Sequence, residues 1–297
     1  MKILISDSFD PSLPELLRKY GEVTSNQAEA AEADIILVRS KTKCTKEYID
    51  QAKKVRLIIR GGVGLDNIDV KYCQEKGIEV HNTAEASSIA VAELAFAMMI
   101  AVPNRLVEAE ISMKAGKWLK KELKRTELFG KTLGILGCGK IGTELAKRAH
   151  AFGMNVVGYD PAVDVHDTIS IKVTVDEVFH EADYISIHTP LTEKTVGFIN
   201  KDSIAKMKNG VVIINTGRGK CVIEQDVVDA LESGKIGFYC NDVWYSDPPE
   251  STPFLKAKNT LLTPHIGAST NENLLRIGKA VDRIIGKFAG NHNHRII

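Results

Sequence analysis

Residues 132–160, TLGILGCGKIGTELAKRAHAFGMNVVGYD, contain the pattern that decides the fold. An apolar, β-branched run predicts a buried strand directly ahead of the glycine-rich turn GCGKIG at 137–142. Apolar residues at helical spacing follow over 141–151, and a second apolar strand at 155–159 ends just before Asp160. Strand, helix and strand in this order form the unit of a parallel sheet with helices packed on its faces.

The turn at 137–142 has the glycine spacing of a dinucleotide-binding site. Its first glycine permits the tight turn, its second lets the backbone approach a pyrophosphate, and its third allows the helix to pack closely on the strand. The N–H groups at the start of the helix attract the pyrophosphate charge. We therefore expect cofactor contacts from Gly137, Gly139, Lys140, Ile141 and Gly142.

Asp160 stands where such a site places a carboxylate for the adenosine ribose. Its negative charge would repel a 2′-phosphate, and the next lysine or arginine along the chain is Lys172. The sequence therefore favours NAD over NADP. A glycine turn alone is also compatible with an ordinary α/β domain, but strand, helix and acid follow one another here in the order that the cofactor requires.

Composition limits the class of protein. The chain has 297 residues, which suggests about two domains. It contains 39 Lys and Arg against 38 Asp and Glu, a net charge of +1 that argues against nucleic acid or an anionic membrane as its main partner. Its longest apolar run, 94–102, is far shorter than the roughly 20 residues that span a bilayer. Five cysteines without a CxxC pair suggest free thiols, so we expect a soluble cytoplasmic protein.

Two series of alternating strands and helices are predicted, with a long helix over 87–115 between them that kinks at Pro103. The first series has expected strands at 2–6, 34–38, 55–59 and 78–80. The second has expected strands at 132–136, 155–159, 171–175, 184–187, 211–215, 238–240 and 260–263. Expected helices flank them at 11–20, 45–52, 141–151, 224–233 and 271–289. The predicted fold is α/β, with two Rossmann-like or flavodoxin-like domains, parallel sheets and an interdomain cleft.

Three side chains stand beyond the carboxyl ends of predicted strands, where open α/β sheets bind their ligands. Arg218 lies between two glycines and suits a bidentate grip on a carboxylate. His265 follows the last strand, and Asp247 follows the strand before it. A carboxylate beside an imidazole fixes the tautomer of the ring and favours its protonated form, which suits a general acid. An arginine on a polar turn and a histidine at the surface are the simpler alternatives.

Several motifs together resemble the D-isomer-specific 2-hydroxyacid dehydrogenases, and within them the branch that acts on D-3-phosphoglycerate. They span most of the chain in the order found in that family. These motifs are RSKTK at 39–43, GVGLDNID at 62–69, the 137–142 glycines, HTPL at 188–191, NTGRG at 215–219 and TPHIGAST at 263–270.

The resemblance implies roles for individual residues. Arg218 would orient the substrate carboxylate, and His265 would exchange the proton of the C2 oxygen while hydride moves to or from nicotinamide. Catalysis is thus expected from Arg218, Asp247 and His265. Further cofactor contacts are expected from His188, Thr189, Pro190, Thr216, Asp242, His265 and Gly267. Substrate contacts are expected from Arg39, Ser40, Arg60, Gly61, Gly62, Val63, Arg218 and His265.

One departure from the family concerns Asp247, where glutamate is usual. Aspartate is shorter by one methylene, so it reaches His265 only if its loop lies closer or a water bridges the gap. His188 could be taken for a second acid–base group, but we prefer a residue lining the cofactor site. Cys138 is interpreted as a small filler, and no cluster has metal-ligand spacing.

The resemblance further implies the domain division 1–85 with 270–297 for substrate, and 86–269 for NAD and for a homodimer surface. Basic residues near the substrate loops, chiefly Arg39 and Arg60, suggest a phosphorylated acid. Because the chain stops at Ile297, we expect no C-terminal regulatory domain and no feedback by serine. A glyoxylate or hydroxypyruvate reductase remains the nearest alternative, and a nucleotide-sensing corepressor-like protein remains a distant one.

Overall fold

The computed structural model describes residues 1–293 and divides the chain into two compact units. Unit 1 comprises 1–88 and 268–297, and unit 2 comprises 89–267. From the sequence, we expect the two boundaries between the domains near residues 85 and 270. The expected interdomain cleft stays a prediction.

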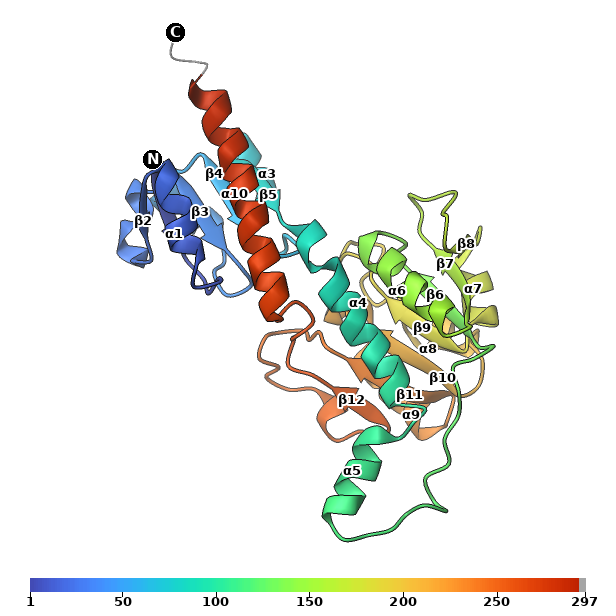
Figure 1. Ribbon diagram of the computed structural model, residues 1–297. Coiled ribbons are helices and arrows are strands. Elements are labelled where there is room, and N and C mark those ends of the chain that lie inside the picture. Colours follow the sequence, from blue (N-terminus) through green and yellow to red (C-terminus); the bar gives the residue numbers. More distant parts are fainter. Residues whose placement is uncertain (294–297) are drawn as a thin grey trace. The chain divides into compact units, whose positions relative to one another are not determined.

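Unit 1 is built on a sheet of five parallel strands in the order β2-β1-β3-β4-β5 (Figure 1). Its strands are β1 (Lys2–Ile5), β2 (Glu22–Thr24), β3 (Ile35–Val38), β4 (Leu57–Arg60) and β5 (Glu79–Asn82). Its helices are α1 (Leu13–Leu17), α2 (Lys46–Gln51), α3 (Val70–Glu75) and α10 (Asn271–Asn293), with short 3-10 turns at Arg18–Tyr20 and Gln27–Glu32.

Alternating residues of β1, β3 and β4 face two separate apolar clusters of unit 1. Ile3 and Ile35, for example, pack with residues of α1 and α10, whereas Leu4 and Ile36 pack with residues of α2 and α3. Strands buried on both faces in this way are typical of parallel sheets between helical layers.

Unit 2 has a sheet of seven parallel strands in the order β12-β11-β10-β9-β6-β7-β8. Its strands are β6 (Thr132–Leu136), β7 (Asn155–Tyr159), β8 (Ser170–Ile171), β9 (Tyr184–Ile187), β10 (Val211–Asn215), β11 (Ile236–Asn241) and β12 (Thr260–Leu262). Its helices are α5 (Leu106–Lys114), α6 (Lys140–Ala151), α7 (Val175–Glu181), α8 (Lys201–Ala205) and α9 (Glu224–Glu232), with most of α4 (Ala84–Ala101) and 3-10 turns at Gly219–Cys221 and Pro253–Leu255.

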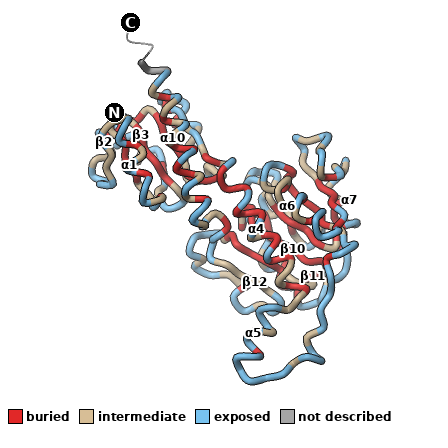
Figure 2. The backbone as a smooth tube through the Cα atoms, viewed as in Figure 1, coloured by how far each residue is buried: buried red, intermediate tan, exposed pale blue. Residues whose placement is uncertain are grey.

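The sheet of unit 2 is also covered on both faces. Helices α7, α8 and α9 contribute to the apolar cluster on one face, and α4 and α6 contribute to the cluster on the other. Along β10 the residues alternate between them, with Ile213 on the first side and Ile214 on the second. The central strands β6, β9 and β10 are almost wholly buried, whereas the outer strand β12 is only partly buried (Figure 2).

The strands of unit 2 end in register, and this alignment gathers the loops that follow them. Asn215 pairs with Asn241 on one side and with Ile187 on the other. The pairing continues from Asn241 to Leu262. It also continues from Ile187 through Leu136 to Tyr159. Because all the strands are parallel, the loops after β12, β11, β10, β9, β6 and β7 leave the sheet at one edge.

Two predicted elements are wrong. The strand expected at 171–175 ends at Ile171, because Thr174 and Glu177 form a reciprocal capping box that starts α7. The single kinked helix expected over 87–115 is two helices, α4 and α5, with a turn between them. Arg105, at the start of α5, has a left-handed backbone (φ 54°) and breaks the continuity.

Helix α4 is the only helix among the described residues that is long and apolar enough to cross a membrane by length and composition. It has 18 residues with a mean hydropathy of 1.5, and 56% of it is buried inside the protein. A core helix of a soluble protein meets the same criteria, and the packing of Ala92, Phe96 and Met99 in the apolar cluster it shares with α6 fits that role.

Candidate active site

The glycine turn between β6 and α6 has the conformation that its sequence predicts. Gly137 has a left-handed backbone (φ 94°), and a Cβ there would lie 2.9–3.0 Å from backbone atoms of His188 and Thr189. A Cβ on Gly142 would lie 2.6 Å from the carbonyl oxygen of Gly137, so helix and turn pack without room for a side chain. By contrast, the space beside Gly139 is open, which leaves its backbone accessible to a pyrophosphate.

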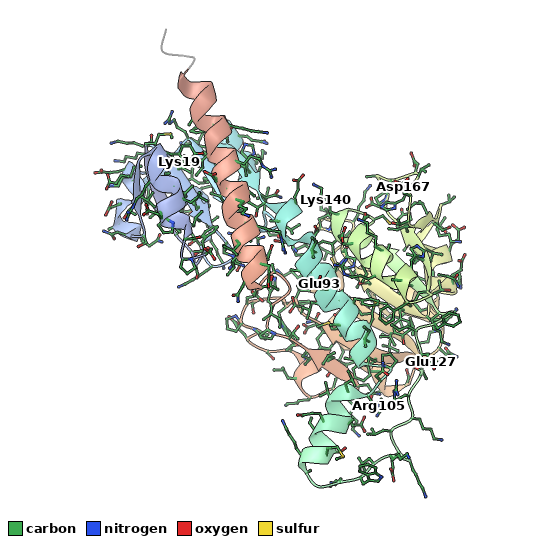
Figure 3. The ribbon with its side chains drawn as sticks, in the orientation of Figure 1. Lys19, Glu93, Arg105, Glu127, Lys140 and Asp167 are labelled. Atoms are coloured by element: carbon green, nitrogen blue, oxygen red, sulfur yellow. The ribbon has the colours of Figure 1, made fainter. Side chains whose placement is uncertain are left out.

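Helix α6 begins at this turn. Lys140, labelled in Figure 3, and Ile141 are its first residues, so their N–H groups belong to the end of the helix that favours an anion. The expected cofactor residues of the turn are thus brought together, and their shape fits a dinucleotide.

Asp160 follows β7 and is already fixed in the turn. Its Oδ2 accepts a hydrogen bond from the backbone N–H of Cys138 at 3.0 Å, and its Oδ1 accepts one from Ala162 at 2.9 Å. An ionised carboxylate has about four acceptor positions, so two stay available for ribose hydroxyls. Cys138 is buried, and desolvation raises the pKa of its thiol to about 12, which leaves it without nucleophilic character.

His188 follows β9 and is held by two hydroxyl groups, one on β9 and one on the loop after β10. Its Nε2 lies 2.9 Å from Ser186 Oγ, and its Nδ1 lies 3.3 Å from Thr216 Oγ1. Burial lowers the pKa of His188 to about 4, so the ring is neutral at physiological pH. A neutral imidazole in this position suits the lining of a cofactor site better than a second acid–base group. Thr189 and Pro190 continue the same loop, with Pro190 exposed.

The loop after β10 carries Thr216 and Arg218. Asn215 anchors it, because its Oδ1 accepts from the backbone N–H of Gly217 at 3.1 Å and its Nδ2 donates to the carbonyl of Arg218 at 3.0 Å. The Arg218 guanidinium donates through Nη1 to the Gly217 carbonyl at 2.8 Å. Arg218 therefore sits on a fixed backbone, with its side chain folded over its own loop.

Asp242, at the end of β11, holds the turn that contains His265. Its Oδ1 accepts from Thr263 Oγ1 at 2.6 Å and from the N–H of Ile266 at 2.8 Å, and its Oδ2 accepts from the N–H of Gly267 at 2.9 Å. The backbone of His265 between them is left-handed (φ 55°), which is costly for a residue with a side chain. Asp242 and Gly267 are expected to contact the cofactor, and this bracing role of Asp242 could not be predicted from the sequence.

Asp247 reaches His265 directly. Its carboxylate Oδ2 pairs with Nδ1 of the imidazole, and both side chains are partly exposed. The shorter acid therefore needs no bridging water, because its loop lies close enough. With Nδ1 paired to a carboxylate, Nε2 is the ring atom that can exchange a proton with a ligand.

The substrate residues expected in unit 1 lie at the carboxyl ends of β3 and β4. The backbone N–H of Arg39 donates to Asp7 Oδ2 at 2.5 Å, and Nη1 of Arg39 donates to the Ser8 carbonyl at 3.3 Å. Ser40 is exposed beside it. The two contacts of Arg39 fix the start of the loop that follows β3.

The Arg60 guanidinium lies against Gly62, where a Cβ would be 1.9 Å from Nη1. Gly61 and Gly62 are buried, and the carbonyl of Val63 accepts from Asn82 Nδ2 at 2.7 Å. The expected substrate residues of unit 1 thus share one edge of its sheet. Among the side chains that the structure describes, no group of three or more His, Cys, Asp or Glu is placed to hold a metal ion.

The lowered pKa of His188 predicts a pH-dependent stability of the cofactor-free protein. Because the folded pKa of about 4 lies below the ordinary value of 6.5, the unfolded chain takes up the proton first. The neutral His188 ring therefore contributes to the free energy of unfolding, by up to about 3 kcal/mol. This contribution is fully present above pH 6.5 and is lost as the pH falls toward 4. We expect His188→Gln to lose this part of the pH slope in urea unfolding between pH 7 and 4.

The matched control for that measurement is His180→Gln, which changes an exposed histidine on α7. Its unfolding free energy should follow that of the unsubstituted protein at every pH. Parallel curves for His188→Gln and the unsubstituted protein would show that His188 titrates as an ordinary histidine.

Comparison with known proteins agrees with this arrangement. Residues 96–267 match the family described as D-isomer specific 2-hydroxyacid dehydrogenase, NAD binding domain. A hydroxypyruvate reductase of Thermotoga maritima is 45% identical over 289 residues, which cover 93% of this chain and 94% of that protein. A D-3-phosphoglycerate dehydrogenase of Methanocaldococcus jannaschii is 40% identical over 299 residues, which cover 97% of this chain.

The chain spans 57% of the length of that phosphoglycerate dehydrogenase. Among solved structures, a D-lactate dehydrogenase from Aquifex aeolicus complexed with NAD and lactic acid matches with a TM-score of 0.87 and 30% identity, covering 99% of this chain and 97% of that one. The family match, the likeness to an NAD-bound structure and the open glycine turn all indicate that the cofactor is NAD. The chain belongs to the D-isomer-specific 2-hydroxyacid dehydrogenase family and uses NAD to interconvert 2-hydroxy acids and 2-keto acids.

Proposed function

We propose that this protein interconverts D-3-phosphoglycerate and 3-phosphohydroxypyruvate. The observation that carries the chemistry is the direct contact between Asp247 and His265, on loops next to that of Arg218 along one sheet edge. Bound NAD supplies a hydride acceptor in the oxidative direction and NADH a donor in the reverse direction.

Each of these side chains has a distinct task in the proposal. Arg218 binds the substrate carboxylate, because a guanidinium matches two carboxylate oxygens with parallel hydrogen bonds. His265 takes the proton of the C2 hydroxyl through Nε2 in oxidation and returns it in reduction. Asp247 fixes the tautomer that makes this possible and stabilises the protonated ring.

The phosphate part of the proposal rests on charge in unit 1. Arg39, Lys41 and Lys43 lie on the loop after β3, and Arg60 ends β4. Phosphate is commonly bound by such groups, with arginine supplying paired donors. Several D-3-phosphoglycerate dehydrogenases, at 38–40% identity, are similar to nearly the whole of this chain.

Hydroxypyruvate, which lacks the phosphate, is the second candidate substrate. It is favoured by the 45% identity to a hydroxypyruvate reductase that matches over 94% of its own length. A solved glyoxylate reductase from Paecilomyes thermophila, with a TM-score of 0.87 and 30% identity, keeps glyoxylate among the acids to be tested. The family assignment makes a purely nucleotide-sensing role the weakest alternative.

A cytoplasmic location is proposed as well. All five cysteines are buried and none forms a disulfide, and burial raises the pKa of Cys44 and Cys138 to about 12. Such thiols are typical of a reducing compartment, where proteins form few disulfides.

A substrate panel followed by NADH absorbance tests the phosphate proposal. We expect kcat/KM for 3-phosphohydroxypyruvate to exceed those for hydroxypyruvate and glyoxylate about 100-fold, because charged hydrogen bonds to a phosphate contribute about 1.5–3 kcal/mol each. Arg39→Gln should lower the first value 10-fold or more and leave the other two unchanged. Equal values for the three acids exclude a phosphate-specific site, and a preference for hydroxypyruvate supports the second candidate.

The role of Asp247 predicts a selective loss of turnover. Asp247→Asn should lower kcat about 100-fold with little change in the Kd for NADH, because the amide keeps the shape but no longer stabilises protonated His265. Glu250→Gln, an exposed change in the same loop, is the control and should behave like the unsubstituted enzyme. Unchanged turnover in Asp247→Asn would remove Asp247 from the mechanism.

We also propose that the protein forms a homodimer through α5 and the segment that follows it. This surface carries several exposed apolar side chains, namely Leu106, Val107, Ile111, Met113 and Trp118, with exposures of 51–74%. Next to it lies a groove of about 270 Å³, lined in part by Val102, Phe238 and Leu261. An apolar surface of this kind is typical of an interface between copies.

Sedimentation velocity tests the dimer. The unsubstituted protein should sediment as a particle of twice the 32.6 kDa mass of the chain. Ile111→Asp should sediment as a monomer, because the dimer would bury the new charge without a partner. Val173→Asp changes a residue that is 88% exposed elsewhere in unit 2 and should leave the dimer intact. A dimeric Ile111→Asp would place the interface on another surface.

A further inference from the structure

We infer that Tyr239 is a positioning residue that ties the loop of Arg218 to the loop of Asp242 and Asp247. It lies on β11, beneath the edge of the sheet where both loops begin, and it is wholly buried. This inference rests on the proposed roles of Arg218 and Asp247. It adds a residue that touches neither substrate nor cofactor.

A buried phenol needs hydrogen-bond partners for its hydroxyl. The ring of Tyr239 packs in the apolar cluster with residues of α7, α8 and α9, and it stacks at a tilt on Phe254 with 4.6 Å between ring centroids. Burial raises the pKa of the Tyr239 phenol, so the hydroxyl stays protonated and remains a donor throughout the working pH range. The position is thus apolar around the ring and polar at its tip.

On one side the hydroxyl contacts the anchor of the Arg218 loop. Nδ2 of Asn215 lies 3.4 Å from the phenol oxygen, as a weak donor to it. The same Nδ2 donates to the carbonyl of Arg218 at 3.0 Å, and Oδ1 of Asn215 accepts from Gly217. Asn215 is completely buried, so the orientation of its amide decides where this backbone lies.

On the other side the hydroxyl donates to the start of the next loop. Tyr239 Oη donates to Oδ1 of Asn241 at 3.0 Å, and Nδ2 of Asn241 donates to the carbonyl of Val243 at 2.6 Å. Asn241 is 1% exposed and immediately precedes Asp242. One hydroxyl therefore joins two buried amides, each of which fixes the backbone of a catalytic loop.

The two loops are also in direct contact, which makes their spacing sensitive to this network. A Cβ on Gly219 would lie 2.4 Å from the backbone of Trp244, so the two loops pack with no room for a side chain between them. The Trp244 indole donates to the carbonyl of Thr263, just before His265. A shift of the Asn215–Tyr239–Asn241 network would thus displace Arg218 and Asp247 relative to His265.

Tyr239→Phe tests the inference, because it removes the hydroxyl and keeps the ring. We expect backbone amides of 216–219 and 242–247 to exchange hydrogen at least fivefold faster in the free protein, in both loops at once. The kcat/KM for the keto acid should fall 10- to 30-fold. The Kd for NADH should change less than kcat/KM does, because the glycine turn and Asp160 are held by β6, α6 and β7, and only Thr216 and Asp242 of the expected cofactor contacts lie in the loosened loops.

Tyr184→Phe is the matched control. Tyr184 is a buried tyrosine of the same sheet whose side chain lies in the cluster on the opposite face. It should leave the exchange of both loops and the kcat/KM at the values of the unsubstituted protein. A second variant, Asn241→Ser, removes the acceptor of the phenol and should reproduce the exchange pattern of Tyr239→Phe, which distinguishes loss of the bridge from a general loss of stability.

Unchanged exchange in both loops for Tyr239→Phe and Asn241→Ser would overturn the inference, as would faster exchange that spreads evenly over unit 2. These measurements need no substrate. They therefore remain decisive even if the substrate panel shows that the unsubstituted protein does not act on 3-phosphohydroxypyruvate.

Discussion

The in-register ending of six parallel strands is the constraint on which the active site depends. The six strands end at residues that are joined by direct pairings, so the loops that follow them start from one line, namely at Leu136, Tyr159, Ile187, Asn215, Asn241 and Leu262. Parallel pairing makes every one of these loops leave in the same direction. The glycine turn, Asp160, His188, Arg218 and His265 are far apart in sequence, and the ladder of backbone hydrogen bonds is what brings their loops to one edge.

Within that edge, polar side chains fix loops that have no regular structure. Asp242 braces the strained backbone of His265 with three hydrogen bonds, and Asn215 braces the loop of Arg218 with two. Buried polar groups of this kind are costly unless they are all satisfied. Here Asp242 and Asn215 both bind backbone groups, so the cost of burying these two side chains is offset. The same hydrogen bonds hold each loop in one conformation.

The glycine turn, Asp160 and the Asp247–His265 pair could be predicted from the sequence, because each depends on local spacing or on loops after neighbouring strands. The contacts confirm that Asp247 reaches His265. The Asn215–Tyr239–Asn241 bridge could not be predicted, because its members look like ordinary strand residues until the register is known. The prediction of a strand over 171–175 was wrong for a local reason. Thr174, which looked like a β-branched strand residue, caps the helix that follows together with Glu177.

The two backbone N–H groups that hold Asp160 have a thermodynamic consequence for the cofactor. A side chain that is immobilised only when a ligand arrives costs about 0.5–1.5 kcal/mol of rotamer entropy. This carboxylate has lost that freedom during folding, so a ribose bound there would meet a preorganised acceptor. By the same reasoning, the adenosine end of NAD should gain roughly 2- to 10-fold in affinity compared with a site whose acid swings freely.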